Sequence, residues 1–187
     1  TDPTFTRATA ATFEDFEGVI RTVESSEPRF QGGRRVRNRL VKTEDLEDVA
    51  WSKTRCTITA SVTDPDGGST AFTLTSEVGG LSFIVDTISD SVAGDSNVNS
   101  WYLKRRTGTG QIRMYTGAGT TALDITSTLT SSWQRFSGGV AAGSASADQM
   151  GLLITTDGDE IDVWHPQSEN VTGQTNQNPS EYVSTGV

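Results

Sequence analysis

Cysteine and histidine are almost absent from this sequence, and their scarcity excludes several kinds of site. The 187 residues contain one cysteine and one histidine. Cys56 cannot form an internal disulfide, and one cysteine with one histidine supplies too few ligands for a zinc site. Cys56 opens an alternating run of apolar and polar residues, which predicts a small buried side chain. No nucleophile motif accompanies His165, so we expect a structural or surface role for it and no catalytic one.

Long apolar runs and an excess of positive charge are also missing. No stretch approaches the roughly 18 apolar residues that span a bilayer, and no basic segment followed by an apolar one opens the chain. The net charge is −9, and residues 56–187 hold the whole acidic excess, with five Lys and Arg against fourteen Asp and Glu. We therefore expect no nucleic-acid partner and no membrane insertion. The first residue is Thr1 instead of Met, so we expect a piece of a longer protein.

What the sequence does contain is glycine, serine and threonine between short alternating segments. Glycine reaches 19 while only 33% of the residues are hydrophobic, which is typical of short strands joined by tight polar turns. We predict strands at residues 56–62, 70–75, 81–85, 97–105, 111–115, 122–127, 133–140, 151–156 and 160–164. Turn sequences such as Asp64-Pro65-Asp66-Gly67-Gly68 separate them. The pattern predicts an all-β fold, an antiparallel β-sandwich of jelly-roll type.

The first 40 residues differ in pattern from the rest. Residues 1–40 mix proline, glycine and charged residues, and they show neither helical nor two-residue periodicity. We predict an extended N-terminal arm at residues 1–40, packing on the body or on a neighbouring subunit. The β-sandwich domain is predicted at residues 41–187. The acidic segment at residues 43–48 is compatible with one helical turn that Thr43 would cap.

A series of short strings, spread in order over almost the whole chain, resembles a module of tailed-phage and prophage structural proteins. The strings are those at residues 6–13 and 18–23, Glu27-Pro28-Arg29-Phe30, Arg37-Asn38-Arg39-Leu40, Thr43-Glu44-Asp45-Leu46, Trp51, Asp64-Pro65-Asp66-Gly67, Ser100-Trp101-Tyr102-Leu103-Lys104, Trp133-Gln134-Arg135, those at residues 163–169, and those at residues 179–185. Such modules look like the family 4 and 9 carbohydrate-binding modules and the concanavalin-like jelly rolls. The resemblance therefore implies glycan or surface binding on the phage particle.

The sequence departs from that family at two places in the arm. The family usually has a Leu-Leu pair where this chain has Arg39-Leu40. An acidic residue that usually precedes this run is replaced by Arg34-Arg35-Val36. The resemblance therefore does not imply how this part of the arm packs.

Four acidic residues near the end of the chain form a candidate metal site. Asp157, Asp159, Glu160 and Asp162 offer oxygen ligands of the kind that Ca²⁺ takes. Glu160 and Asp162 alternate along a predicted strand and should point to the same side of it. The resemblance adds to this prediction, because sandwich carbohydrate-binding modules often carry a structural calcium. The simplest alternative is that Asp157-Gly158-Asp159 is a solvated turn between strands.

Two predicted strands supply a candidate ligand-binding patch. Tyr102 and Lys104 share one side of the strand at residues 100–105, and Arg113 and Tyr115 share one side of the strand at residues 111–115. If the two strands pair through the turn at residues 106–110, all four side chains form one exposed patch. Aromatic rings with cationic neighbours suit a glycan. The alternative is an ordinary outer face with extended Lys and Arg side chains.

The function predicted from the sequence is that of a non-catalytic virion module for attachment or glycan recognition. Two alternatives stay open: a purely structural or decoration protein of capsid or tail, and an accessory carbohydrate-binding module of a secreted enzyme. The expected partner is a glycan or a surface protein of host or virion, and a homo-oligomer remains compatible with the sequence. The expected location is the virion surface, with secretion as the alternative.

Overall fold

The first of two compact units is a short arm. The computed structural model describes residues 6–15, 20–26, 37–115, 122–138, 141–142 and 148–186. The chain divides into Thr1–Val36 and Arg37–Val187. Within the first unit, β1 (Ala11–Glu14) and β2 (Ile20–Val23) pair antiparallel. The arm, which we predicted to be mostly extended, therefore contains two strands that the sequence pattern did not reveal.

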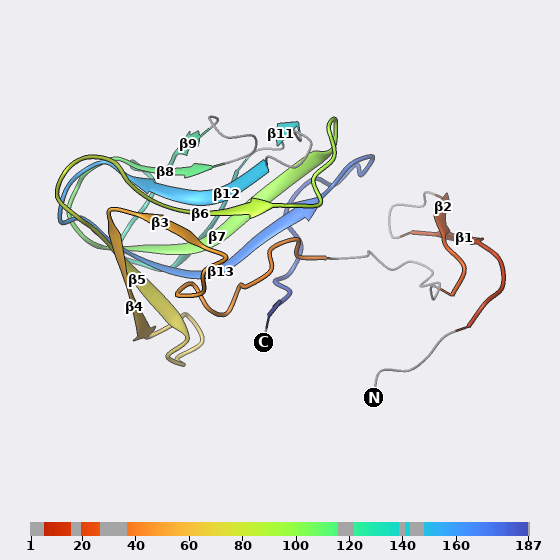
Figure 1. The fold of residues 1–187 in the computed structure, drawn as a ribbon, viewed down its shortest axis with the longest axis horizontal. Helices are drawn as coiled ribbons and strands as arrows, with labels where there is room; N and C mark the ends of the chain where they lie inside the picture. The colour runs from red at the N-terminus through yellow and green to blue at the C-terminus, as the bar shows by residue number, and fades with distance from the viewer. Residues whose placement is uncertain are drawn as a thin grey trace. The chain divides into compact units, whose positions relative to one another are not determined.

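The second unit is built from two antiparallel sheets. Its strands are β3 (Ser52–Thr54), β4 (Cys56–Val62), β5 (Ala71–Ser76), β6 (Ser82–Ile88), β7 (Ser96–Thr107), β8 (Ile112–Tyr115), β9 (Ala122–Asp124), β10 (Gln134–Ser137), β11 (Ala141–Ala142), β12 (Asp148–Ile154) and β13 (Glu160–Asn170). Sheet I has the order β10-β7-β13-β5-β4, with β11 also pairing with β7. Sheet II has the order β3-β6-β12-β8-β9. The two sheets form two layers (Figure 1), which confirms the predicted β-sandwich.

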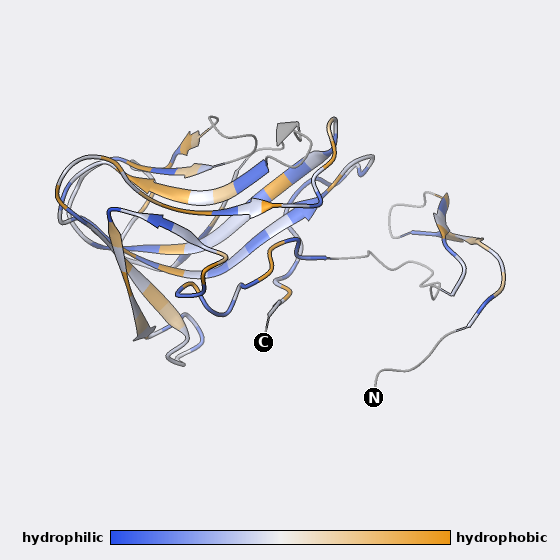
Figure 2. Cartoon of the chain, in the orientation of Figure 1, coloured by the Kyte–Doolittle hydropathy of each residue, from blue (hydrophilic) through white to orange (hydrophobic). Residues whose placement is uncertain are grey.

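The core lies between the two sheets, because alternate residues of each strand point inward. Trp101 and Leu103 on β7 are 0% exposed, as are Ile112 and Met114 on β8. Trp51, just before β3, packs on Trp101 with ring centroids 5.4 Å apart. Hydrophobic and hydrophilic positions are interspersed along the strands of both sheets (Figure 2). The residues that alternate with these inward ones are Tyr102 and Lys104 on β7 and Arg113 and Tyr115 on β8, and all four are only partly buried. The predicted sharing of one side by each pair is confirmed.

The predicted strands all have counterparts in the structure. The segment at Cys56–Val62 was predicted with the bounds that β4 has. Cys56 is buried as expected, its thiol donates a hydrogen bond to the Phe83 carbonyl at 3.2 Å, and burial raises the pKa of the thiol. The sequence pattern did not reveal β3 and β11, which are only three and two residues long. Strands this short carry too few alternating positions for a pattern to be visible.

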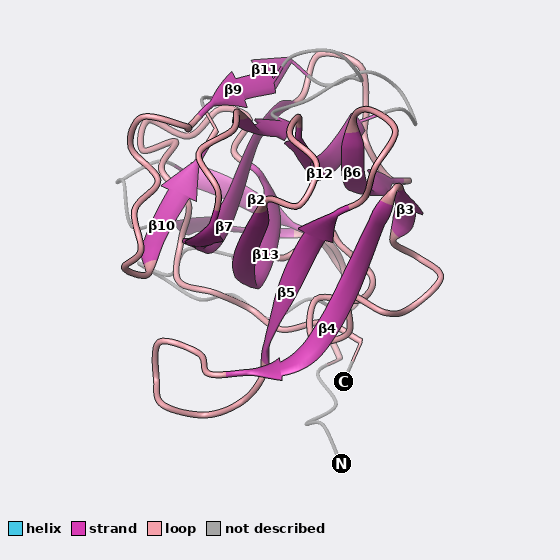
Figure 3. Cartoon of the chain, turned by 90° about the vertical axis from the view of Figure 1, so that its left-hand side faces the viewer, coloured by secondary structure: helices cyan, strands magenta, loops and turns pink. Residues whose placement is uncertain are grey.

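Residues 43–48 form turns and bends instead of the predicted helical turn. The hydroxyl of Thr43 caps no helix. It accepts a hydrogen bond from the Thr185 amide at 2.9 Å, and the Thr43 amide donates to the Thr185 carbonyl at 3.2 Å. The described residues contain no helix (Figure 3), and so none that is long and apolar enough to cross a membrane.

Residues 37–40 belong to the second unit and are bonded into it. The Asn38 side-chain amide donates to the carbonyls of Pro166 (2.9 Å) and Val183 (3.0 Å). The Arg39 side chain is buried and donates to the Asn97 side-chain carbonyl at 2.6 Å. These contacts join the start of the unit to its last strand and its C-terminal segment.

The core assignment predicts the effect of truncating Trp101. We expect Trp101→Ala to lower the free energy of unfolding by about 3–5 kcal/mol, because it removes a fully buried ring and leaves a cavity. Urea denaturation followed by far-ultraviolet circular dichroism measures the change. Val49, which is 97% exposed, provides the control, and Val49→Ala should stay within about 0.5 kcal/mol of the wild type. If Trp101→Ala changed the free energy of unfolding as little as Val49→Ala does, the inward placement of Trp101 would be contradicted.

Candidate functional site

The outer face of sheet I carries a row of polar side chains that crosses four strands. The row runs through Thr59 on β4, Thr73 on β5, Asp162 on β13 and Lys104 on β7, each the register partner of the next. The neighbouring residues Val163 and Leu103 point into the core and are 0% exposed. Because side chains alternate along a strand, the row must lie on the outward surface.

The carboxylate of Asp162 is the centre of this row and is fully buried. It accepts a hydrogen bond from the Thr73 hydroxyl at 2.6 Å (Oγ1 to Oδ1). The Lys104 ammonium lies 2.9 Å from Oδ2, and the Arg106 guanidinium lies 3.2 Å from Oδ1. A buried carboxylate is costly unless it is paired and hydrogen-bonded. Asp162 therefore holds both cations in fixed positions over the sheet.

Arg106 reaches this face because the pairing of β7 with β13 is irregular there. Glu160 pairs with Thr107 and Ile161 with Arg105, so Arg106 is an extra residue between the two pairs. Bulges of this kind re-aim a side chain. The Arg106 guanidinium lies 3.5 Å from the Glu160 carboxylate, so Glu160 and Asp162 act on the same side of β13, as predicted.

A groove of about 420 Å³ lies over this row. Its walls are formed by residues of β4, β5, β7 and β13, together with Thr63, which directly follows β4. The lining residues are Thr59, Ala60, Ser61, Val62, Thr63, Thr73, Thr75, Lys104, Arg106 and Glu160. One wall follows a register shift in β4 between Thr59 and Val62, where Ser61 has a φ of 63°. Threonine and serine hydroxyls, two cations and one carboxylate thus face a common space.

The aromatic rings on this face already have partners. The Lys104 ammonium lies over the half-buried Trp133 ring, 5.0 Å from its centroid. The Arg135 guanidinium lies over the Tyr102 ring at 5.5 Å, and Trp164 packs on Tyr102 edge to face at 5.5 Å. None of the residues that line the groove is aromatic. The groove consequently presents hydrogen-bonding groups and no bare stacking platform.

His165 on β13 is enclosed in an aromatic stack. Its ring centroid lies 3.3 Å from that of Trp164 and 3.6 Å from that of Tyr182. The register shift between Trp164 and Gln167 and a φ of 48° at His165 turn the ring out of the strand. Burial lowers the pKa of His165 from 6.5 to about 4, against the opposing effect of the Asp64 charge and with a smaller contribution from Arg135. The imidazole is therefore neutral at pH 7 and has a structural role.

The C-terminal segment covers the other part of the same face. The Ser180 carbonyl accepts a hydrogen bond from Arg135 at 2.6 Å, and the Val183 amide donates to Gln167 at 2.7 Å. The Tyr182 hydroxyl donates to Glu44, and burial together with this bond raises its pKa. Figure 1 shows this segment beside the chain that enters the second unit. No described residue of this segment lines the groove.

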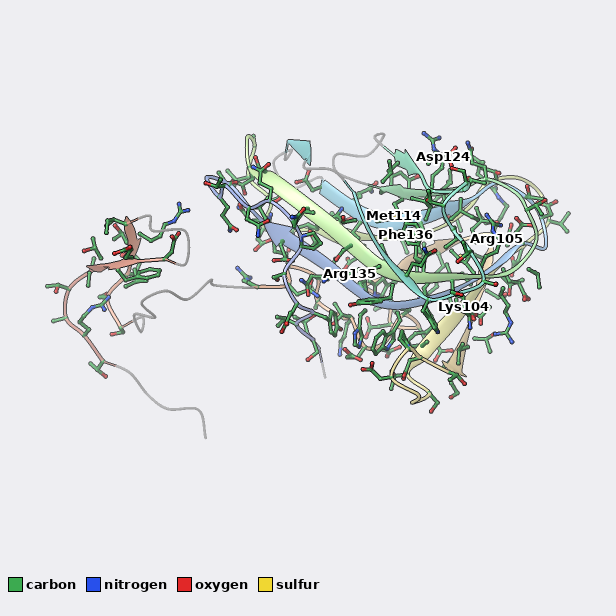
Figure 4. All side chains as sticks on the ribbon, turned by 180° about the vertical axis from the view of Figure 1, so that it is seen from behind. Lys104, Arg105, Met114, Asp124, Arg135 and Phe136 are labelled. Carbon is green, nitrogen blue, oxygen red and sulfur yellow. The ribbon has the colours of Figure 1, made fainter. Side chains whose placement is uncertain are left out.

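The four residues of the predicted ligand patch do not come together. Tyr102 and Lys104 lie on β7 of sheet I, whereas Arg113 and Tyr115 lie on β8 of sheet II. Figure 4 shows Lys104 and Asp124, the register partner of Arg113, on different layers of the sandwich. The predicted pairing of the two strands is wrong, and sheet I alone carries Tyr102 and Lys104.

Glycines between β7 and β8 allow the chain to change sheets. A Cβ on Gly108, whose φ is +81°, would lie 1.8 Å from the Asp159 carboxylate. The Gly110 amide donates to that carboxylate at 2.7 Å. The carboxylate thus fixes a loop that leads across to sheet II instead of the tight hairpin that we predicted.

The predicted calcium ligands do not converge either. Asp159 binds Arg105 (3.4 Å) and the loop, while Asp162 and Glu160 bind the cations of the groove. Asp157 is exposed and accepts a long hydrogen bond from the Gly79 amide at 3.4 Å. No group of three or more Asp, Glu, His or Cys side chains in the described part of the chain is arranged to hold a metal ion. Asp157 and Gly158 form a turn, as the alternative interpretation predicted, whereas Asp159 is buried instead of solvated.

Arg106, Thr59 and Thr73 belong to the site but were not predicted. Threonines are ordinary on the outward face of a strand, so those at residues 56–62 and 70–75 gave no sign of a site. Their role depends on the order β13-β5-β4 in sheet I, and β13 is separated from β4 and β5 by about half of the chain. Local pattern carries no information about that neighbourhood.

No family model matches this sequence, and no curated protein matches it. Among solved structures, the enzymatically active domain of tailspike protein 4 of bacteriophage CBA120 is 16% identical, with a TM-score of 0.48 over 68% of this chain and 20% of that chain. The CBM22-1–GH10 modules of Clostridium thermocellum xylanase 10B, complexed with xylohexaose, are 16% identical, with a TM-score of 0.46 over 76% and 29%. This chain thus spans less than a third of either.

A solved structure that this chain matches over almost its whole length shows similarly low identity and TM-score. TmCBM61, in complex with β-1,4-galactotriose, is 10% identical, with a TM-score of 0.47 over 72% of this chain and 99% of that one. At these identities and TM-scores, the comparisons carry no information about which residues of this chain bind a ligand.

The buried imidazole predicts a pH dependence of stability. The unfolded chain should protonate His165 near pH 6.5 and the folded protein only near pH 4, so the unfolded state binds more protons between these values. His165 then lowers the free energy of unfolding as the pH falls from 6.5 to 4, by up to about 3 kcal/mol. Above pH 7 the imidazole is neutral in both the folded and the unfolded state, so His165 no longer lowers the free energy of unfolding.

Comparison with His165→Phe, which keeps a planar ring in the stack but never gains a charge, isolates this effect. Urea unfolding at several pH values should give a difference between wild type and variant that grows in favour of the variant as the pH falls below 6.5. Parallel pH profiles for the two proteins would show that the imidazole is not held neutral.

Proposed function

We propose that this protein is a non-catalytic carbohydrate-recognition module that binds a saccharide in the groove on the outer face of sheet I. The observation that carries the proposal is the row of hydroxyl and charged groups that the register of four paired strands holds in one plane. Sites on regular strands are positioned more rigidly than sites on loops. A ligand of many hydroxyl groups needs such fixed donors and acceptors.

The lining supplies both kinds of hydrogen-bonding group. Thr59 is exposed, and its hydroxyl is able to donate and to accept. Thr75 is half-buried, and its hydroxyl, which donates to Glu160, is able to accept. Lys104 and Arg106 donate only, and the Glu160 carboxylate accepts. Because Asp162 already fixes the two cations, little side-chain entropy is lost when a ligand engages them.

A binding role agrees better with these contacts than a hydrolytic one. Glycoside hydrolysis commonly requires two carboxyl groups that flank the bond to be cleaved. Asp162 is 0% exposed and bonded to Thr73, Lys104 and Arg106, so it has no access to a ligand. His165 lies inside an aromatic stack and is equally unsuited to act as a base.

We further propose that the module acts on the surface of a phage particle, in attachment. The support for this is the ordered series of strings from residue 6 to residue 185 that resembles tailed-phage structural proteins. An accessory module of a secreted enzyme would use the same groove. The fold does not distinguish the two, whereas a neighbouring catalytic domain in the full-length gene would identify the accessory module.

A glycan array tests the binding role, with one variant that blocks the groove. Thr59 is exposed on the edge strand β4, so Thr59→Trp fills the groove without breaking the ion pairs of Asp162. We expect the wild type to bind a defined set of glycans and Thr59→Trp to lose at least about tenfold in affinity, or about 1.4 kcal/mol.

Thr87→Trp is the matched control, since Thr87 is an exposed threonine on β6 of sheet II. It should bind as the wild type does. A blank array at high protein concentration would overturn the proposed function. Equal binding by Thr59→Trp and wild type would place the site elsewhere on the module.

A further inference from the structure

The charges in the groove are not equally available to a ligand. The Asp162 side chain is 1% exposed, whereas those of Lys104 and Arg106 are 25% and 49% exposed and that of Glu160 is 28% exposed. A ligand in the groove therefore meets two cations and one carboxylate. The carboxylate that balances the second cation lies beneath them, out of reach.

The two cations also retain unused hydrogen-bond donors. An ammonium has three donors, and the Lys104 ammonium forms an ion pair with Asp162 at 2.9 Å. Arg106 binds Glu160 through Nε and binds Asp162 and Thr73 through Nη1. Its Nη2 makes no hydrogen bond or ion pair to any described residue. The side of the groove formed by β7 thus offers donors that require an acceptor.

The carboxylate of Glu160 already has two partners within the protein. It lies 3.5 Å from the Arg106 guanidinium, and its Oε1 accepts a hydrogen bond from the Thr75 hydroxyl at 3.2 Å. The exposed polar groups that remain are mainly donors and hydroxyls. Charge-assisted hydrogen bonds from such donors to an anionic oxygen are about twice as strong as neutral ones.

The remainder of the unit limits how much negative charge a ligand can bring. Residues 37–187 contain ten Lys and Arg and eighteen Asp and Glu. A long polyanion would be repelled by this surplus wherever it left the groove. A saccharide with a single anionic group at the groove, and no other charge, avoids that repulsion.

From this geometry we propose that the ligand is a saccharide that carries one acidic sugar, whose carboxylate binds Lys104 and Arg106. The inference rests on the proposed function and specifies its ligand class. The hydroxyls of Thr59 and Thr75 then bind the neutral sugars on the β4 side of the groove. Asp162 takes no direct part and positions the two cations.

Titration calorimetry with matched oligosaccharides tests this proposal. In each pair, the two members differ only in a carboxylate or a hydroxymethyl group on one ring. Sulfated oligosaccharides and a polyuronate complete the set, which separates a carboxylate from a sulfate and a single charge from many. We expect the carboxylate member to bind at least about tenfold tighter than the neutral member. Its advantage should shrink when salt is raised from about 0.05 to about 0.5 M.

Arg106→Gln is the informative variant, because Lys104 and Thr73 still satisfy the Asp162 carboxylate in its absence. We expect the variant to lose most of the preference for the acidic member, because its affinity for that member should fall by a larger factor than its affinity for the neutral one. Arg113→Gln on sheet II is the matched control and should keep the preference.

Several outcomes would overturn the inference. Equal or tighter binding of the neutral members, with Thr59→Trp still abolishing binding, would refute the acidic ligand and leave the proposed function intact. Tightest binding of the sulfated sugars or of the polyuronate would refute the single carboxylate. Loss of binding to every saccharide would instead refute the proposed function itself.

Discussion

The register between β7 and β13 is the constraint on which the core and the candidate site both depend. Leu103 pairs with Val163, and the next pair along is Lys104 with Asp162. The first pair is buried between the sheets and the second lies on the outer face. A slip of one residue would exchange the two faces and bring the ion pair into an apolar core. The same alternation that stabilises the sandwich therefore fixes the polar groups of the groove.

Much of this arrangement follows from the sequence. The alternation in the segments that contain Trp101 and Ile112 predicted which residues are inward, and the Asp64 turn is present with its carboxylate accepting the Asp66 and Gly68 amides. The bounds of β4 were predicted correctly. Local pattern suffices here, because the physical causes are local: side-chain alternation and turn chemistry.

The errors at the candidate site concern contacts between distant segments. Arg113 was assigned to the same surface as Lys104, because a turn with two glycines was expected to close a hairpin, and the Asp159 carboxylate instead holds that loop across the edge of the sandwich. The acidic cluster was interpreted as a metal site, because its partners Lys104 and Arg105 lie more than fifty residues away. The covering C-terminal segment has no strand pattern at all.

The central claim is that a ligand binds over β4, β5, β13 and β7. Amide chemical-shift mapping during a titration with a saccharide that the protein binds tests it most directly. The account predicts that the shifted resonances cluster around Thr59, Thr73, Lys104 and Asp162, and that those of β8 and β9 stay unchanged. Shifts concentrated on sheet II, around Arg113 and Tyr115, would contradict it.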